Sequence, residues 1–302
     1  MPPNSSVAII IINWKMYDLT NYCIQSVLKS SYKYFKIILI DNECTKPEFF
    51  EKNKKIHIIK NKNNEGFSKA NNQGVKYALK NKYDYIMLLN NDTLVNDDLL
   101  ELLIKKLNNS NYKIIQPLIL NYDGSKIWNA GAKINKFFGI FYTPAKGLNF
   151  ENFNQNKDET EWFTGCCAIF KSEIFYEVGL FDESFFAYYE DVDFSLRLKD
   201  NGYRIGLLND SYLLHYESAS SKSDNQKEGS LSPMVHYLNI RNHIIVLRKH
   251  LKYFNLLGAT IFQFFKLFVY TLYFILRLRL YKLKMVYKGL YDSLKNKKND
   301  SS

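Results

Sequence analysis

Three acidic residues, Glu190, Asp191 and Asp193, form the segment best suited to proton-transfer chemistry. They follow the aromatic stretch Phe185 to Tyr189 and begin a predicted helix over Val192 to Leu198. One carboxylate beside an aromatic wall could deprotonate a hydroxyl while the rings hold a sugar. Carboxylates at a helix N-terminus are also stabilised by the helix dipole, so capping is the alternative explanation.

Two further residues could bind a metal ion. Asp92 ends the apolar stretch 85–91 and could present one hard oxygen ligand to a divalent cation that neutralises a diphosphate. An Asx turn, or a cap for a helix beginning near Asn96, would explain Asp92 equally well. His215 follows the apolar run Tyr212 to Leu214, and a single histidine is more often structural than metal-binding.

Two polar segments could contact a nucleotide. Asp41 follows the apolar run Ile37 to Ile40, and its carboxylate could accept hydrogen bonds from a base or ribose; capping of the next helix is the alternative. The segment 64–74 begins with Asn64, Glu65 and Gly66 and opens a helix, so its backbone N–H groups could hold an anion. An ordinary helix start with a solvated polar face would look the same.

The elements that must position these residues alternate between strands and helices. Alternation of this kind predicts a parallel α/β sheet, whose ligands bind at the carboxyl ends of the strands, where Asn13, Asp41, Asn91 and Asp92 fall. A second ordered block follows the irregular, aromatic-rich excursion 122–161, which could shape a pocket. The predicted strands are 7–12, 36–40, 56–59, 85–89, 166–170, 204–208 and 212–214, and the predicted helices of the first block are 19–29, 66–79 and 97–107.

Composition limits the class of protein. The 302 residues are 46% hydrophobic and can bury a large core, and a formal charge of +11 indicates anionic partners without identifying them. The four cysteines lack C-x-x-C spacing and indicate reduced thiols rather than a zinc site or a disulfide framework. The first residues lack the pattern of a signal peptide, so we expect a cytoplasmic catalytic part.

The last quarter of the chain changes character near Tyr253, where apolar and aromatic residues dominate up to Leu276. This stretch is long enough to span a bilayer. Polar residues at helical spacing instead favour a helix lying in the membrane interface, with Lys and Arg reaching the headgroups. Packing on the protein's own body or in a homodimer is the alternative. The polar stripe comprises Gln263, Lys266, Tyr270, Tyr273, Arg277, Lys284 and Lys288.

Taken in order, these segments resemble the family 2 glycosyltransferases of the GT-A fold, especially the rhamnosyltransferase-like branch. The resemblance covers about residues 7–250. It implies an α/β fold with a Rossmann-like mixed sheet flanked by helices. The residues that carry it are Ile10-Ile11-Ile12-Asn13-Trp14, Ile40-Asp41-Asn42, Asn64-Glu65-Gly66-Phe67, Asn71-Asn72, Leu89-Asn90-Asn91-Asp92, Thr164-Gly165, Gly179-Leu180-Phe181-Asp182-Glu183, Phe185-Phe186, Glu190-Asp191-Val192-Asp193, Gly202-Tyr203 and His215.

The resemblance also implies roles for residues. Asp191 would be the general base, supported by Glu190, and Asp92 and His215 would hold Mg²⁺ or Mn²⁺ at the diphosphate. The donor-binding set would be Asn13, Asp41, Asn64, Gly66, Phe67, Asn71 and Asn91, and the acceptor-binding set Trp162, Thr164, Gly165 and Tyr189.

Two departures from the family pattern affect these assignments. Only Asp92 remains of the usual D-x-D pair, which leaves the number of metal ligands open. Lys46 stands where many relatives have an aspartate, which leaves the donor base open.

We therefore expect residues 1–250 to form a catalytic domain and residues 251–302 a helical, membrane-associated extension. The expected reaction is inverting transfer of a sugar, with rhamnose one candidate, from a nucleotide-diphosphate donor to a glycan or lipid-linked acceptor used in cell-surface polysaccharide synthesis. The protein would lie peripherally at the inner face of the cell membrane. A nucleotide-sugar-binding protein without turnover is the alternative. Net charge alone does not support nucleic-acid binding, and we expect none.

Overall fold

The computed structural model describes residues 5–46, 48–50, 53–154, 157–216 and 231–295. The chain divides into two compact units. The first comprises residues 1–133, 143–186 and 190–217 and contains the large sheet, and the second comprises residues 134–142, 187–189 and 218–302 and is mainly helical. The boundary near residue 250 stays a prediction; the helix that ends at Lys249 belongs to the second unit.

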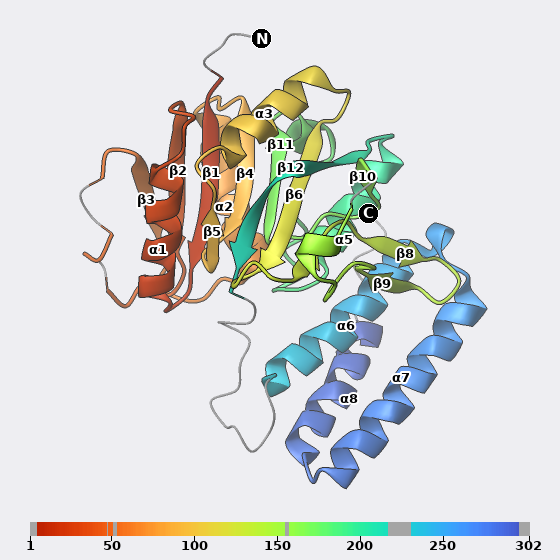
Figure 1. The fold of residues 1–302 in the computed structure, drawn as a ribbon. Coiled ribbons are helices and arrows are strands. Elements are labelled where there is room, and N and C mark those ends of the chain that lie inside the picture. Colours follow the sequence, from red (N-terminus) through yellow and green to blue (C-terminus); the bar gives the residue numbers. More distant parts are fainter. Residues whose placement is uncertain (1–4, 47, 51–52, 155–156, 217–230, 296–302) are drawn as a thin grey trace. The chain divides into compact units, whose positions relative to one another are not determined.

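The first unit is built on a mixed sheet (Figure 1). Its strands follow the order β10-β12-β6-β11-β4-β1-β2-β3, with β5 paired to β12 and β7 paired to β6. β11 runs antiparallel to both of its neighbours, and β12 runs parallel to β6. The strand bounds are β1 Val7–Asn13, β2 Phe35–Asp41, β3 Ile56–Lys60, β4 Tyr85–Asn90, β5 Thr93–Val95, β6 Ile114–Asn121, β7 Ile127–Asn129, β10 Glu159–Thr160, β11 Cys167–Lys171 and β12 Ile205–His215.

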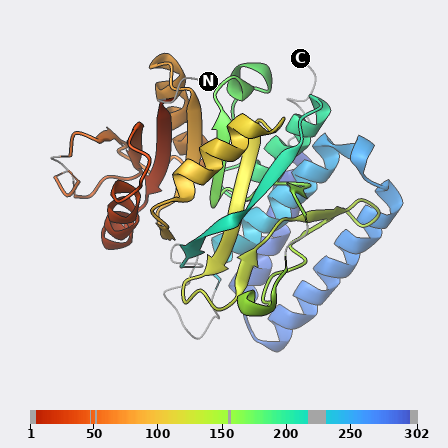
Figure 2. The same ribbon diagram turned by 45° about the horizontal axis from the view of Figure 1, so that its top comes forward.

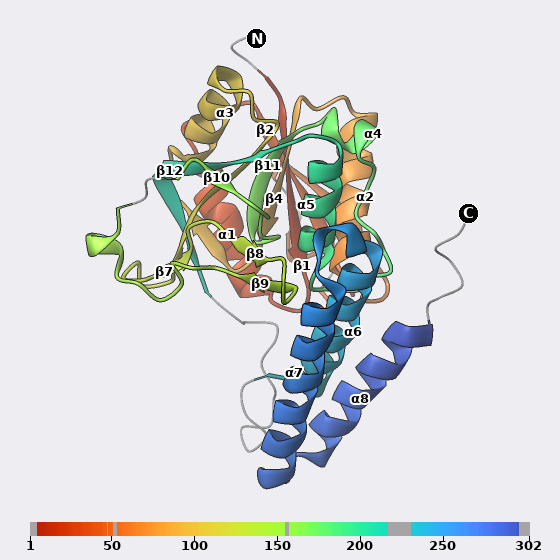
Figure 3. The same ribbon diagram turned by 90° about the vertical axis from the view of Figure 1, so that its right-hand side faces the viewer.

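Helices cover both faces of this sheet because its central strands are apolar on both sides. Ile9 and Ile11 of β1 face one cluster, with α1 (Tyr17–Leu28) and α3 (Leu99–Asn109). Ile10, between them, faces the other cluster, with α2 (Phe67–Lys80), α4 (Ile174–Glu177) and α5 (Glu190–Asp200). Figure 3 shows these two groups of helices on opposite sides of the sheet, and Figure 2 shows α3 lying across β6 and β12. The expected mixed α/β sheet flanked by helices is confirmed.

The strand register brings the polar strand ends to one edge of the sheet. Asn13 pairs with Asp41 across β1 and β2, and Ile12 pairs with Asn90 across β1 and β4. Because β11 is antiparallel, its beginning lies at the same edge, where the Asn90 amide donates to the Cys166 carbonyl at 2.8 Å. The carboxyl ends of the parallel strands therefore share this edge with the start of β11.

Sequence periodicity predicted two strands, 204–208 and 212–214, where the structure has the single strand β12. Its ladder with β6 is interrupted: Leu208 pairs with Pro117 and Tyr212 pairs with Leu118. The residues 209–211 form a bulge that no single periodic pattern spans, which explains the incorrect split. Beyond the bulge, His215 pairs with Thr93 of β5.

The second unit contains three long helices: α6 (Pro233–Lys249), α7 (Leu256–Leu276) and α8 (Leu280–Lys295). Pro233 starts α6, where its missing N–H costs nothing, and the Asn255 side chain caps α7 by accepting from the Gly258 amide at 2.8 Å. The unit also contains the hairpin strand β9 (Ile140–Tyr142), which pairs with β8 (Lys133–Asn135). Short 3₁₀ turns lie at Phe150–Asn152 and Leu251–Tyr253.

The predicted polar stripe of the tail is wrong in two respects. One helix does not continue to Lys288, because α7 ends at Leu276 and Leu278 adopts a positive φ of 52° before α8. The first residues of the stripe also do not face outward, whereas Tyr273, Arg277, Lys284 and Lys288 are exposed. Gln263 and Lys266 turn toward α6, where Lys266 Nζ lies 3.1 Å from His243 Nδ1. Burial lowers the pKa of Lys266 to about 8.

The opposite side of α7 is apolar and exposed. Six of its large side chains are between 46% and 69% exposed: Leu257, Ile261, Phe264, Phe265, Phe268 and Leu272. By length and composition, α7 is the one helix among the described residues that could cross a membrane. The sequence predicted an amphipathic helix, but the first polar residues of its stripe, Gln263 and Lys266, face α6.

Candidate active site

The donor-side residues begin with a chain of hydrogen bonds along the sheet edge. Asn13 Nδ2 donates to Asp41 Oδ1 at 2.7 Å, and Asn13 Oδ1 accepts from the Thr20 hydroxyl at 2.8 Å. That hydroxyl in turn accepts from Asn91 Nδ2 at 2.8 Å. Asp41 and Asn13 are both almost completely buried. The ends of β1, β2 and β4 are thereby tied together, and Thr20, a helical residue outside every motif, is a link that sequence reasoning missed.

A second network holds the turn before α2. Asn42 donates to Asn64 Oδ1 at 2.8 Å, while Asn42 Oδ1 accepts from the Glu65 amide at 2.9 Å. Asn64 Oδ1 also accepts from the Gly66 amide at 3.0 Å. These amide side chains shape the turn that follows β3. Asn42 was recognised only as part of a motif, yet it is the residue that links this turn to the end of β2.

Gly66 and Phe67 contact Phe186, a residue of the aromatic stretch that precedes the acids. Gly66 has a φ of 81°, and a Cβ built there would lie 2.6 Å from the Phe186 carbonyl oxygen, which accepts from the Phe67 amide at 2.6 Å. Only glycine fits this approach. Asn71 donates back to the Phe67 carbonyl at 3.1 Å within α2, so one of its amide donors is already used by its own helix.

Asp92 and His215 are brought together by the pairing of β5 with β12. His215 Nε2 lies 3.2 Å from Asp92 Oδ1, and both side chains are at most 10% exposed. Among the described residues, Asp92 Oδ1 and His215 Nδ1 lack a hydrogen-bond partner of acceptable geometry. A buried carboxylate oxygen and an imidazole left in this state suit a divalent cation, which prefers such oxygen ligands and keeps other positions for phosphate or water.

Asp92 and His215 supply only part of the ligand set that a divalent cation needs. The described residues contain no group of three or more His, Cys, Asp and Glu side chains arranged around a metal position. Two protein ligands are nevertheless typical of Mg²⁺ sites that take further ligands from a bound diphosphate. Burial lowers the pKa of His215, but Cys166 and the Asp92 carboxylate outweigh that effect and raise it to about 10.

Trp128 is a neighbour of this pair that the sequence did not single out. Its ring meets that of His215 edge-to-face, with the ring centroids 4.5 Å apart. The indole Nε1 is buried and lacks an acceptor among the described residues. Lys146 Nζ lies 5.3 Å from the centre of the same ring. A lone tryptophan on a short strand carries no motif, so only the fold reveals its position beside His215.

Asp191 stands at the first turn of α5 with both carboxylate oxygens engaged by backbone donors. Its Oδ2 accepts from the Gly165 amide at 2.9 Å, and its Oδ1 accepts from the Val192 amide at 2.8 Å. The Val192 bond is the capping interaction that the sequence allowed as an alternative. The Gly165 bond is different, because it joins α5 to the residue that precedes β11 and fixes the carboxylate relative to the sheet edge.

The pKa values of the two adjacent acids are raised together. Burial raises the pKa of Asp191 to about 6, against the hydrogen bonds from Gly165 and Val192, which lower it. Burial and then the Asp191 charge raise the pKa of Glu190 well above its ordinary value. Glu190 Oε2 is buried without a hydrogen-bond partner in the part of the chain that the structure describes. At neutral pH this arrangement favours one ionised carboxylate, on Asp191, beside a protonated one on Glu190.

Asp193 has a different role from its neighbours. It is completely buried and accepts a hydrogen bond at 2.9 Å from Arg197 Nε, one turn further along α5. Arg197 also donates to the carbonyls of Val178 and Leu180 at 2.9 and 2.8 Å. The pair therefore locks α5 onto the loop that follows α4, which makes Asp193 a structural residue.

The expected acceptor residues are only partly brought together. Thr164 and Gly165 adjoin the acids: a Cβ at Gly165 would lie 3.1 Å from Phe67 Cε1 and 3.6 Å from Glu190 Oε1. Trp162 precedes them and donates from Nε1 to the Lys133 carbonyl at 3.3 Å. Tyr189 belongs to the second unit, where its ring stacks on His243 with 5.2 Å between centroids.

The mixed sheet carries amide and carboxylate side chains at one edge and an acidic residue after β4, and an acid pair begins α5. This arrangement is that of a GT-A glycosyltransferase. The chain belongs to glycosyltransferase family 2, whose sequence profile matches residues 6–179. The resemblance inferred from the motifs is thereby confirmed.

Two relatives show how far the similarity extends. The low-salt glycan biosynthesis hexosyltransferase Agl10 of Haloferax volcanii is 30% identical over 146 residues, which cover 48% of this chain and 46% of that protein. The chain thus matches about half the length of this relative. The dTDP-rhamnosyl transferase RfbF of Shigella flexneri is 24% identical over 82% of this chain and 81% of its own length.

Solved structures share the fold at low sequence identity. GalNAc-T7 with UDP, GalNAc and Mn²⁺ superposes with a TM-score of 0.63 at 16% identity, over 82% of this chain and 48% of that one. The mannosyltransferase PcManGT of Pyrobaculum calidifontis, with GDP-Man and Mn²⁺, gives a TM-score of 0.57 at 13% identity, over 97% and 76% of the two chains.

Proposed function

We propose that this protein is an inverting, metal-dependent glycosyltransferase that moves a sugar from a nucleotide-diphosphate donor to a hydroxyl of a glycan or lipid-linked acceptor. The observation that carries the proposal is the Asp191 carboxylate, which is fixed by two backbone donors and has a pKa of about 6. A base with such a pKa is ionised at neutral pH and still accepts a proton effectively.

In the proposed reaction Asp191 takes the proton of the acceptor hydroxyl as its oxygen attacks the anomeric carbon. The bond between that carbon and the diphosphate oxygen breaks on the opposite side, so the configuration inverts and a nucleoside diphosphate leaves. Glu190, held protonated beside Asp191, keeps a second negative charge away from the acceptor. The Gly165 and Val192 amides hold the carboxylate in place during proton transfer.

Asp92 and His215 would hold Mg²⁺ or Mn²⁺. When bound there, the cation would neutralise negative charge on the leaving diphosphate. Two of the solved neighbours contain Mn²⁺ together with a nucleotide or nucleotide sugar, which supports a divalent cation for this chain. The indole N–H of Trp128 lies beside His215 and has no acceptor in the described ranges of the chain, so it is suited to donate to an oxygen of the same diphosphate.

The donor nucleoside would lie against the network of Asp41, Asn13 and Asn64. Asp41 retains acceptor capacity for a ribose or base after its bond from Asn13. Gly66 and Phe67 would form the adjoining wall. The absence of a side chain at Gly165 lets Phe67 and Glu190 pack closely around it, since a Cβ there would lie 3.1 Å from Phe67 Cε1 and 3.6 Å from Glu190 Oε1.

Relatives support a role in cell-surface glycan assembly. Their names include a low-salt glycan hexosyltransferase, a dTDP-rhamnosyl transferase and an O-antigen biosynthesis protein. We propose polysaccharide synthesis as the setting, with a rhamnose donor as the first to test. Localisation would be cytoplasmic and peripheral to the membrane.

The helical tail would bind the membrane surface through the apolar side of α7. That side is exposed over several turns, and the segment that follows it carries Arg277, Arg279 and Lys284, whose charges suit anionic headgroups. A helix lying in the interface accounts for both features. A homodimer that covers the same face is the competing outcome.

A turnover screen tests the proposal. The full-length protein would be incubated with Mn²⁺ and a panel of nucleotide sugars, including dTDP-rhamnose, and release of the nucleoside diphosphate would be followed with and without a lipid-linked acceptor. Acceptor-stimulated release that is absent from the Asp191→Asn variant is expected. Tight nucleotide-sugar binding without release from any donor would instead favour the non-catalytic binding protein.

A further inference from the structure

A cavity of about 670 Å³ opens in the first unit, away from the acids of α5 along the chain. It is formed by the excursion after β7 together with β10, which the sequence had indicated as a region able to shape a pocket. A volume of this size is typical of small-ligand sites. Its lining residues are Ala130, Gly131, Ala132, Lys133, Pro144, Ala145, Leu148, Phe153, Asn154, Lys157, Glu159, Thr160 and Glu161.

The floor of this cavity is fixed by hydrogen bonds. Thr160, which is 9% exposed, accepts from the Ala132 amide at 2.7 Å and donates to the Trp162 carbonyl at 2.7 Å. The Gly131 amide donates to Asn129 Oδ1 at 2.8 Å. Gly131 has a φ of 94°, and a Cβ there would lie 2.8 Å from Leu207 Cδ1, so the backbone passes where side chains could not. The cavity is therefore shaped by packed backbone.

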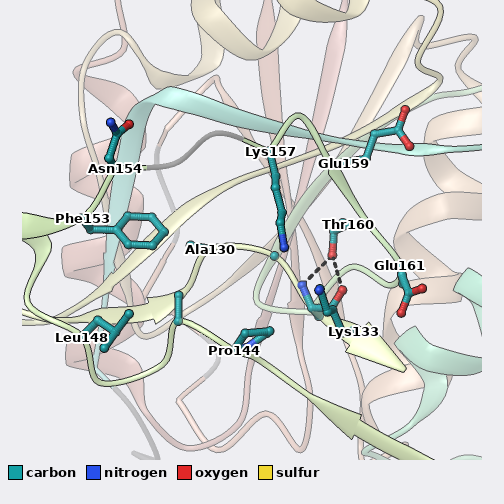
Figure 4. A pocket seen from close by; sticks show the side chains of 13 residues that line it. Ala130, Lys133, Pro144, Leu148, Phe153, Asn154, Lys157, Glu159, Thr160 and Glu161 are labelled. Carbon is teal, nitrogen blue, oxygen red and sulfur yellow. Dashed lines mark hydrogen bonds between the residues drawn. The ribbon is translucent and has the colours of Figure 1, made fainter. Parts of the chain in front are cut away.

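One wall is apolar and the other is cationic (Figure 4). Leu148 and Phe153 lie on one side, and Lys133 and Lys157 lie on the other. The backbone of Lys157 is anchored, since its carbonyl accepts from Asn209 Nδ2 at 2.9 Å. An apolar wall facing hydrogen-bond donors suits a sugar ring, which has both C–H faces and polar edges.

The two lysine side chains approach each other closely enough to interact. The close approach of the Lys133 ammonium lowers the pKa of Lys157 because the two positive charges repel each other, burial adds to the shift, and Glu161 opposes it. Like charges that approach in this way are relieved by an anion between them.

The acidic residues of the lining do not fully cancel this charge. Glu159 Oε1 accepts from Tyr112 at 2.9 Å and from Arg204 at 2.6 Å, so its carboxylate is already committed. In Figure 4 that carboxylate points away from Lys157. Arg204 already pairs with Glu159, so Lys133, Lys157 and Glu161 together leave one excess positive charge around the cavity.

We propose that this cavity binds a saccharide unit bearing an anionic group, a carboxylate or a phosphate, within the acceptor glycan. The inference rests on the proposed glycosyltransferase function and names its acceptor class. The ring would pack against Phe153 and Leu148, and the anion would bridge Lys133 and Lys157.

The chain path connects this cavity to the proposed base. Thr160 lines the cavity, and Gly165, five residues later, donates to Asp191. Five residues span at most ~18 Å, a distance that an oligosaccharide of a few units can bridge. The anionic unit would therefore lie a few sugars away from the hydroxyl that receives the new residue.

Ligand-detected NMR titration of the full-length protein tests this. The probes are glucuronate, glucose 6-phosphate and neutral glucose, each measured against wild type, Lys133→Ala, Lys157→Ala and Lys157→Arg. Lys80→Ala, an exposed lysine of α2 outside the lining, is the matched control. Circular dichroism and melting temperature verify that each variant is folded.

At least one anionic sugar is expected to bind more tightly than glucose, and the one that does so identifies carboxylate or phosphate as the anion. Loss of either lysine should weaken its binding about ten-fold, as for other charge-assisted hydrogen bonds. Lys157→Arg should retain most of the affinity, and Lys80→Ala should leave it unchanged. Equal binding of glucose, no binding of either anionic sugar, or affinities insensitive to both lysines would overturn the inference.

The donor screen on wild-type protein distinguishes this failure from failure of the proposed function. Nucleotide-sugar turnover without anionic-sugar binding would remove the acceptor assignment and leave the enzyme class. Anionic-sugar binding without turnover of any donor would leave the cavity as a site for anionic sugars and remove the enzyme class.

Discussion

The Gly165 amide donates a hydrogen bond to Asp191 Oδ2 at 2.9 Å, joining the start of β11 to the first turn of α5. The two residues are 26 positions apart, and the bond places the proposed base at the sheet edge that also carries Asn13, Asp41 and Asn90. Capping alone would have needed only the Val192 amide. The additional bond makes Asp191 the best-positioned carboxylate of its cluster.

Asp191→Asn should lower the turnover number of sugar transfer by about 10²–10⁴-fold, the range typical of a lost general base. Donor affinity should change little, because Asp41 and Asp92 are untouched. Steady-state kinetics and calorimetry with the nucleoside diphosphate measure the two quantities. Normal turnover in this variant would remove Asp191 from the mechanism.

The pH dependence of turnover should follow the raised pKa of Asp191. The carboxylate acts as a base only when ionised, so the rate should rise with pH up to about 6 and then level off. Its contribution to folding stability changes with pH in the opposite direction. Because folding raises its pKa from 3.8 to about 6, the stability it contributes is complete below 3.8 and is lost as pH rises through 6. Rate profiles and denaturant titrations from pH 4 to 8 would show both trends, and Asp191→Asn should flatten the difference.

Asp92→Ala should abolish the Mn²⁺-dependent part of nucleoside diphosphate binding, since it removes the one carboxylate beside His215. His215→Ala should weaken it less, because His215, whose pKa is raised to about 10, must lose a proton before it can bind the cation. Calorimetry with and without Mn²⁺ measures this, and Asp97→Ala, an exposed acid close by in sequence, serves as the control. Unchanged Mn²⁺ dependence in Asp92→Ala would place the cation elsewhere.

Arg197→Ala should reduce the free energy of unfolding by about 3–5 kcal/mol, because it leaves the buried Asp193 carboxylate without its charged partner. Arg204→Ala breaks an exposed pair with Glu159 and should cost less than about 1 kcal/mol. Urea denaturation of both variants tests the contrast. Similar losses from the two variants would show that Asp193 is not the buried anchor of α5.

Phe265→Glu combined with Phe268→Glu should release the protein from anionic vesicles by at least ten-fold. Burying one large apolar side chain contributes about 1.5–3 kcal/mol, and both of these rings are exposed on α7. Co-sedimentation after washing with high salt provides the measurement. Tyr176→Glu, an exposed aromatic residue of α4, is the control. Wild-type protein that stays soluble, or that forms a dimer these substitutions dissociate, would contradict a membrane role.

The sheet was predictable because its central strands are uninterrupted β-branched and apolar runs. The run Val7 to Ile12 is typical of a buried strand, and the polar residue after each such run indicated the binding edge of the sheet. The pairing of Asp92 with His215 was not predictable from spacing. It depends on β5 and β12, two elements separated by more than a hundred residues, one of them only three residues long.

The tail shows a different limit. Periodicity revealed that α7 has a polar and an apolar side, but it contains no information about which side meets another helix. The polar side of α7 faces α6 because the ring of His243 in α6 offers an acceptor to Lys266 and Gln263. Trp128 and Thr20 illustrate the same point at the active site, since each matters through a neighbour distant in sequence.

The bulge in β12 has a consequence for how this chain can change length. Leu208 and Leu213 face the same cluster although five positions separate them, so the interruption at 209–211 reverses the alternation of side chains. The bulge changes which face of the sheet each later side chain points to, so that His215 points toward Asp92. Substitutions at the exposed Asp210 should be tolerated easily, whereas a one-residue deletion at 209–211 would move Tyr216 into the position of His215, beside Asp92. Natural variation at this point should therefore alter residue identity far more often than residue number.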